Sequence, residues 1–163
     1  MFVIAFLSIW CPTTKTTTCD GDLMALQDIR ENIARDIREP VLHVCQRLVD
    51  RLAAMRPDQL QRLTYILLAN FAQTKPDDEL FQSALTALTT IKHNPLTLYF
   101  VFYDEGEDRE IAVSASEVMQ SVDEMMFIHP RTGEEIEDFT SQLKPVYKAS
   151  QEFMNALVAA NGR

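Results

Sequence analysis

The spacing of apolar residues changes at Asn94-Pro95, and this change constrains the fold more than any other feature of the sequence. Before it, apolar side chains recur every three or four residues, which is the spacing of one face of an α-helix. After it, residues 96–103 (LTLYFVFY) are rich in the aromatic and β-branched side chains that strands favour. A chain of 163 residues that carries the two patterns in separate blocks is predicted to adopt an α+β fold.

Three helical stretches are predicted before the change. Residues 23–56 carry one apolar stripe, and Pro40 is expected to kink or break it because proline lacks a backbone donor. Residues 57–72 are apolar on most sides, which indicates a helix at the centre of the fold. The third helix is expected over residues 76–93, with Thr74 as a candidate cap.

A β-hairpin and shorter elements are predicted after the change. Residues 96–103 should pair with residues 109–114 around a turn that contains Gly106. Ser114 or Ser116 can cap a short helix over residues 117–122. The remaining expected elements are a strand over residues 125–128 and helices over residues 134–143 and 146–160.

The most apolar positions of these elements predict the core. The central helix is apolar on too many sides to lie on a surface. The residues expected to be mostly buried are Leu67, Leu68, Phe71, Leu85, Leu88, Phe100 and Phe102.

The order of helix, helix and hairpin over residues 57–114 is compatible with a winged-helix unit. Many small α+β domains share this order, so it does not fix a function. The predicted architecture is therefore a set of N-terminal helices over about residues 23–93, then a hairpin and short helices, in a winged-helix-like arrangement.

The N-terminal residues differ in composition from the rest. Residues 1–22 combine an apolar run (FVIAFLSIW) with a threonine-rich stretch, and residues 23–163 are predicted to form a single globular domain. The apolar run is too short for a membrane-spanning helix and lacks the basic residues of a signal peptide. Three interpretations remain open: an ordered strand, a poor signal segment, and an extension upstream of a start at Met24. We predict a cytoplasmic location, with secretion through residues 1–19 as the alternative.

The net charge of −9 is concentrated in the second half of the chain. Residues 20–75 contain 8 acidic and 8 basic residues, whereas residues 104–138 contain 12 acidic residues and 2 arginines. Such a surface repels nucleic acid and anionic membranes and suits a basic protein partner. The charge also has a simpler interpretation, since acidic residues promote solubility.

The predicted interaction surface lies in this acidic stretch. Its charged part is the hairpin tip with Asp104, Glu105, Glu107 and Asp108. Apolar residues supply most of the affinity in protein interfaces, and the candidates for them are Phe127, Ile128 and Phe139. The alternative for these three residues is that they fill the core.

No arrangement of residues indicates catalysis, a cofactor or a metal. The four glycines are far apart, which argues against a glycine-rich phosphate-binding loop. His43 and Cys45 should point to different sides of one helix, and Cys45 lies on an apolar stripe, so we interpret it as a core thiol. The acidic residues of the turns are expected to be hydrated, which disfavours acid–base catalysis.

Three functional hypotheses follow. The first is a non-enzymatic protein-interaction or adaptor domain that binds a basic protein or self-associates through the acidic surface. The second is a winged helix-turn-helix regulator that binds DNA through its helices, which the acidic balance of the chain disfavours. The third is a small enzyme, for which a buried carboxylate or histidine in a deep pocket would be the sign.

Overall fold

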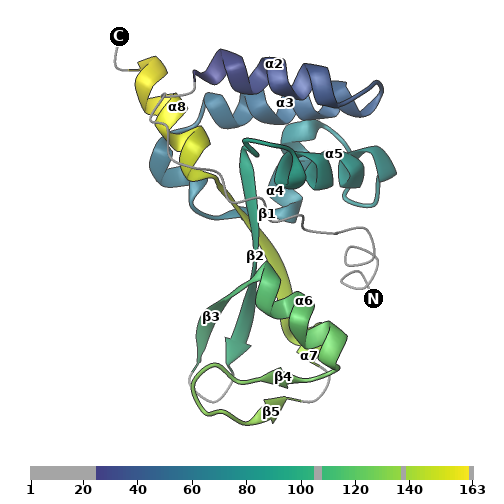
Figure 1. Cartoon of the computed structure of the whole chain (residues 1–163), viewed down its shortest axis with the longest axis vertical. Coiled ribbons are helices and arrows are strands. Elements are labelled where there is room, and N and C mark those ends of the chain that lie inside the picture. Colours follow the sequence, from purple (N-terminus) through teal and green to yellow (C-terminus); the bar gives the residue numbers. More distant parts are fainter. Residues whose placement is uncertain (1–24, 105–107, 137–138, 162–163) are drawn as a thin grey trace. The chain divides into compact units, whose positions relative to one another are not determined.

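The computed structural model describes residues 25–104, 108–136 and 139–161, and these residues form an α+β fold. They fall into two compact units (Figure 1). Unit 1 comprises Leu98–Val146, and unit 2 comprises the described residues up to Thr97 and from Tyr147 onward. The chain passes between the units within two strands. The prediction of one globular domain over residues 23–163 stays a prediction, and the segment 1–22 lies outside the described residues.

The first helical stretch is divided as the sequence predicts. Helix α2 (Leu26–Asp36) ends before Pro40, and α3 (Val41–Ala53) begins directly after it. Both helices bury one apolar stripe, represented by Ile29 and Ile33 on α2 and by Leu48 on α3. Since α3 packs against α2, α4 and α5, it lies at the centre of unit 2.

The helix predicted over residues 57–72 is shorter in the structure. The 3-10 helix η1 (Pro57–Leu60) and the short strand β1 (Leu63–Thr64) come first, and α4 begins at Tyr65 and ends at Ala72. The reason is a cap inside the predicted helix. The Thr64 hydroxyl accepts the Leu67 N–H at 3.2 Å, and this bond fixes the start of α4.

The third helix, α5 (Glu79–Thr90), begins slightly later than predicted. Asp78 caps it in place of Thr74, because the Asp78 carboxylate accepts the backbone N–H groups of Leu80 and Phe81 at 2.8 and 3.3 Å. A carboxylate at this position also interacts favourably with the positive end of the helix dipole.

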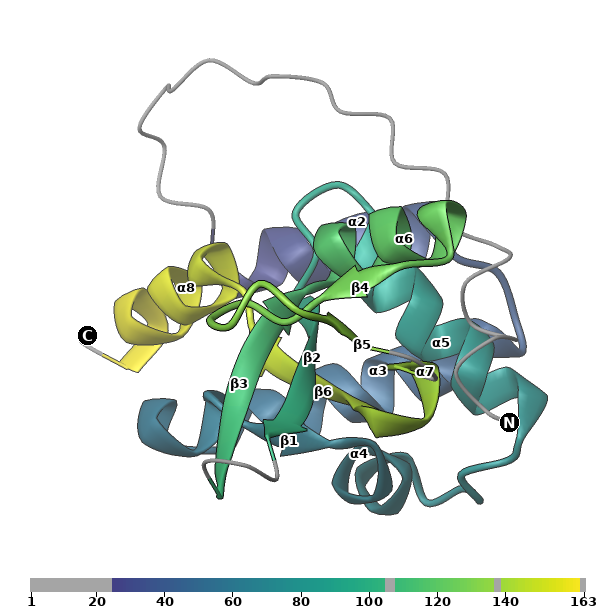
Figure 2. The same cartoon turned by 90° about the horizontal axis from the view of Figure 1, so that it is seen from below.

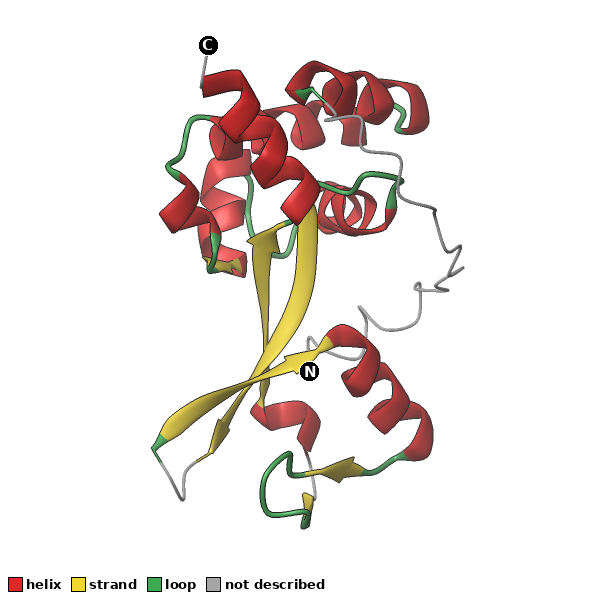
Figure 3. Cartoon of the chain, turned by 60° about the vertical axis from the view of Figure 1, so that its left-hand side comes forward, coloured by secondary structure: helices red, strands yellow, loops and turns green. Residues whose placement is uncertain are grey.

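The predicted hairpin is confirmed. Strand β2 (Leu96–Asp104) pairs antiparallel with β3 (Arg109–Ser114), as Figure 3 shows. Their register places Phe100 opposite Val113. The predicted capping by Ser114 is also confirmed, and the helix it begins, α6, spans Ala115–Glu124. The third predicted strand is β4 (Phe127–Ile128), which pairs with β5 (Glu135–Ile136).

The predictions for the last third of the chain are partly wrong. In the described part of the predicted helix over residues 134–143, Glu135–Ile136 form β5, Phe139–Gln142 form the short helix α7, and Leu143 begins β6 (Leu143–Ala149). Residues at the start of the predicted final helix also belong to β6, so that α8 begins only at Gln151 and ends at Asn161. Strand β6 lies between β1 and β2 in the four-stranded sheet β1-β6-β2-β3, and this pairing with distant residues overrides the local helical pattern.

Most of the predicted core residues are buried. Leu68, Leu85, Leu88, Phe100 and Phe102 are inaccessible to solvent or nearly so. Leu67 and Phe71 are half-buried, because Leu68, Ala69 and Ala72 form the buried face of α4. The core of unit 1 brings one face of the hairpin together with α6, β4, α7 and the start of β6. The winged-helix arrangement of residues 57–114 stays a prediction.

Candidate interaction surface

The acidic hairpin tip is only partly described by the structure. Asp104 ends β2 and is half-buried, with its carboxylate 3.1 Å from His129 Nε2. Asp108 begins the return from the turn, is exposed, and accepts a hydrogen bond from the Tyr103 hydroxyl. Glu105 and Glu107 lie outside the described residues. Asp104 therefore has a structural contact that the sequence did not reveal.

Both ring nitrogens of His129 take part in hydrogen bonds. Its Nδ1 accepts the backbone N–H groups of Arg131 and Thr132 at 3.2 and 3.1 Å. We infer that the ring proton is on Nε2, which then donates to Asp104. The ring also packs nearly perpendicular to the ring of Phe102, with 5.5 Å between the centroids. This arrangement links the β4–β5 turn to the end of β2 and uses both ring nitrogens of the histidine.

The two phenylalanines of the predicted surface lie in the core of unit 1. Phe127 and Phe139 are both buried, and their rings stack at 5.5 Å with an interplanar angle of 24°. Phe102 contacts Phe127 on another side at 5.7 Å. Alternation along β4 explains the burial, since Phe127 points inward and Ile128 points outward.

Exposed apolar residues do gather in unit 1, directly after α6. Met125 is 87% exposed, Ile128 is 46% exposed and Met126 is 38% exposed. Met125 ends α6 with a left-handed backbone, φ 54°, which terminates the helix and leads the chain into β4. Figures 1 and 2 show α6 and β4 side by side, in agreement with their contacts. Ile128 is one of the residues predicted for the interface, whereas the two methionines carry no signal that the sequence pattern could reveal.

A shallow groove of about 250 Å³ accompanies these residues, and we call it the α6–β4 groove. Strand β3 contributes one wall, and the other residues come from α6 and from β4 and the residues beside it. Its lining residues include Ala112, Glu117, Gln120, Glu124, Met126 and Ile128. None of the described residues that line it is lysine or arginine.

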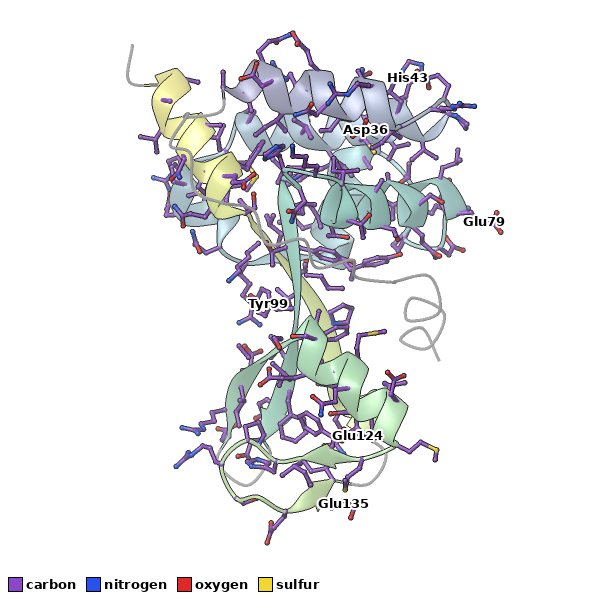
Figure 4. The ribbon with its side chains drawn as sticks, in the orientation of Figure 1. Asp36, His43, Glu79, Tyr99, Glu124 and Glu135 are labelled. Atoms are coloured by element: carbon purple, nitrogen blue, oxygen red, sulfur yellow. The ribbon has the colours of Figure 1, made fainter. Side chains whose placement is uncertain are left out.

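The charged rim of the groove is ordered by hydrogen bonds. Ser114 donates its hydroxyl and its backbone N–H to the Glu117 carboxylate at 2.7 and 2.8 Å. These two bonds lower the pKa of Glu117, so its carboxylate is ionised at neutral pH. Gln120 donates to Glu124 at 2.8 Å, one helical turn further along α6. Glu124 lies at the end of α6 nearest to β4, as Figure 4 shows.

Cys45 and His43, the two groups considered for catalysis or metal binding, lie in different environments. Cys45 is fully buried, its thiol lies 3.8 Å from the Ala84 carbonyl oxygen, and burial raises its pKa to about 12. His43, two residues earlier, is exposed (Figure 4), with its Nε2 3.4 Å from the Glu39 carboxylate. The burial of Cys45 and the exposure of His43 confirm that the two side chains point to different sides. Within residues 25–104, 108–136 and 139–161, no three candidate ligands cluster closely enough to hold a metal ion.

Comparisons with known proteins add no family or relative to these observations. The chain matches no family model, no curated protein and no solved structure. Among the helices of the described residues, none has both the length and the apolar character needed to cross a bilayer.

Proposed function

We propose that this protein is a non-enzymatic interaction or adaptor domain that binds a basic protein partner through the α6–β4 groove. One observation carries the proposal: exposed Met126 and Ile128 line a groove that Glu117 and Glu124 also line, and Met125, directly before Met126 in the chain, is 87% exposed. Neighbouring exposed apolar side chains with a polar border are typical of binding surfaces.

The two kinds of residue have different roles in such a surface. Methionine side chains are flexible and polarizable, so Met125 and Met126 can adapt to the shape of an apolar partner residue. Desolvation of these side chains and of Ile128 would supply most of the affinity. The carboxylates of Glu117 and Glu124 would attract lysine or arginine, which raises the association rate and fixes the orientation of the partner.

The test is selection from a library of random short peptides displayed on phage, with the wild-type protein as bait. We expect enrichment of peptides that combine apolar residues with lysine or arginine. Their affinity should fall at least about tenfold, equivalent to 1.4 kcal/mol, for the variants Met126→Lys and Ile128→Lys.

The matched control is Ile66→Lys, which places the same charge at an exposed apolar position of α4 in unit 2. This control should bind the selected peptides as tightly as the wild type does. Circular dichroism must first show that all three variants are folded. Peptides that bind the groove variants and the wild type equally would contradict the proposal, as would a library that yields no binders.

A winged helix-turn-helix regulator is the second candidate, and the order of elements favours it. Helices α4 and α5 both pack against α3, and β2 follows α5. The exposed residues of α5 oppose it, because they are Glu79, Leu80, Ser83 and Thr90, and none can neutralise a phosphate. Retention on double-stranded DNA that falls steeply with added salt would support the regulator. If the protein passes unretained through a column of immobilised double-stranded DNA at low salt, the regulator hypothesis is contradicted.

A further inference from the structure

Strand β3 is the edge of the four-stranded sheet, and the α6–β4 groove lies along it. Among the described residues the strand order is β1-β6-β2-β3, so β3 pairs with β2 on one side and with no other described strand on the other. Ala112 and Val113 of β3 line the groove. An edge strand beside a groove with exposed apolar side chains is the arrangement to which proteins add an extended peptide as a further strand.

The hydrogen bonds of Ser114 indicate which backbone groups of β3 face outward. The Ser114 N–H donates to Glu117, so the pair Tyr99–Ser114 is a non-hydrogen-bonded pair of the antiparallel ladder. Such pairs alternate with hydrogen-bonded pairs, which makes Val101–Ala112 non-hydrogen-bonded as well. The N–H and C=O of Ala112 therefore point away from β2, toward the free edge.

The size and charge of the groove indicate what fits there. Pockets for drug-sized ligands usually occupy about 300–1,000 Å³, and the α6–β4 groove, at about 250 Å³, is smaller and open. It has room for one or two side chains of a longer segment. Glu117 and Glu124 lie along one helix that borders the groove, so the segment should carry positive charge.

We infer that the partner binds as an extended, basic segment that adds to β3 as a fifth strand of the sheet. This inference rests on the proposed function and specifies the mode of binding. Backbone hydrogen bonds to Ala112 hold the segment in register. Because side chains alternate along a strand, apolar residues at every second position meet Met126 and Ile128. Lysine or arginine residues of the segment pair with Glu117 and Glu124.

The first test is the variant Ala112→Pro, with Ala112→Val as its matched control. An edge strand tolerates proline where the N–H faces outward, so Ala112→Pro removes one donor and keeps the sheet. Valine is similar in size and keeps the donor. The probe is the groove-dependent basic peptide selected from the phage library. We expect its affinity to fall at least about tenfold for Ala112→Pro and less than about threefold for Ala112→Val.

The second test uses the wild-type protein, so it holds even if Ala112→Pro does not fold. The same peptide is synthesised as a series in which one backbone amide at a time is N-methylated. Strand addition predicts that methylation weakens binding at alternate positions, because only every second amide faces β3. A bound helix would instead lose affinity at consecutive positions after its first turn, since the amides there bond within the peptide.

The outcomes separate this inference from the proposed function. If no selected peptide depends on Met126 and Ile128, the proposed function has failed. A groove-dependent peptide that binds Ala112→Pro normally and tolerates methylation at every amide would leave the function intact and overturn strand addition. Dimerisation of the wild type that Ala112→Pro abolishes would also overturn the inference, because a second copy would then occupy the β3 edge.

Discussion

Helix α4 provides a direct test of which face of the central helix supports the fold. Leu68 is 0% exposed and Ile66, two residues earlier, is 65% exposed. Truncation of each to alanine removes a similar amount of apolar side chain from very different environments. The pair therefore compares buried and exposed positions within one helix.

The expected loss for Leu68→Ala follows from its burial. The substitution removes three carbon atoms, which at about 0.8 kcal/mol each lose about 2.4 kcal/mol of transfer free energy. The cavity that remains adds to this, so the total is expected within about 2–5 kcal/mol. Ile66→Ala should change the free energy of unfolding by less than about 0.5 kcal/mol, because it leaves no cavity. Half-buried Leu67 should give an intermediate loss when changed to alanine.

The assay is urea unfolding followed by circular dichroism, with the free energy of unfolding extrapolated to water for each variant. Equal midpoints for Leu68→Ala and Ile66→Ala would refute the assignment of the buried face of α4. A larger loss for Leu67→Ala than for Leu68→Ala would do the same, and would restore the sequence-based expectation that Leu67 is a main core residue.

Three further predictions concern single side chains. Because the pKa of Cys45 is raised by burial, the unfolded chain loses the thiol proton near pH 9 and the folded chain only near pH 12. The free energy of unfolding should therefore fall between these pH values by up to about 1.4 kcal/mol per pH unit. Urea titrations at each pH should show a smaller slope for Cys45→Ala. Ser114→Ala should cost about 1 kcal/mol of stability by removing the cap of α6, and an unchanged urea midpoint would contradict this role. Asp104→Ala should lower the free energy of unfolding by about 1–3 kcal/mol, because it leaves the His129 Nε2–H without its acceptor. The proton NMR spectrum of this variant should show altered amide signals from the β4–β5 turn, whereas a spectrum and stability like those of the wild type would show that the contact is dispensable.

Local signals explain the elements that were predicted correctly. Pro40 separates α2 from α3, and Ser114 caps α6 with Glu117 in the reciprocal position. The aromatic and β-branched run at residues 96–103 forms a strand. In each case, residues within a few positions of one another determine the local conformation, so the sequence alone contains the information.

Contacts between distant residues explain what could not be predicted. Strand β6 depends on neighbours from two other parts of the sequence, β1 and β2. The sequence shows how many acidic residues lie within residues 104–138, but it does not show that Asp104 contacts His129. The exposure of Met125 and Met126 depends on how β4 lies against α6, and no spacing in the sequence reveals it.

The most direct test of the α6–β4 groove as a binding surface is a nuclear magnetic resonance titration of the isotope-labelled protein with the selected basic peptide. We expect the largest amide shift changes on Ala112, Glu124, Met126 and Ile128, and we expect them to shrink at high salt as the carboxylates are screened. Shift changes confined to α4 and α5, with the groove residues unmoved, would contradict this expectation.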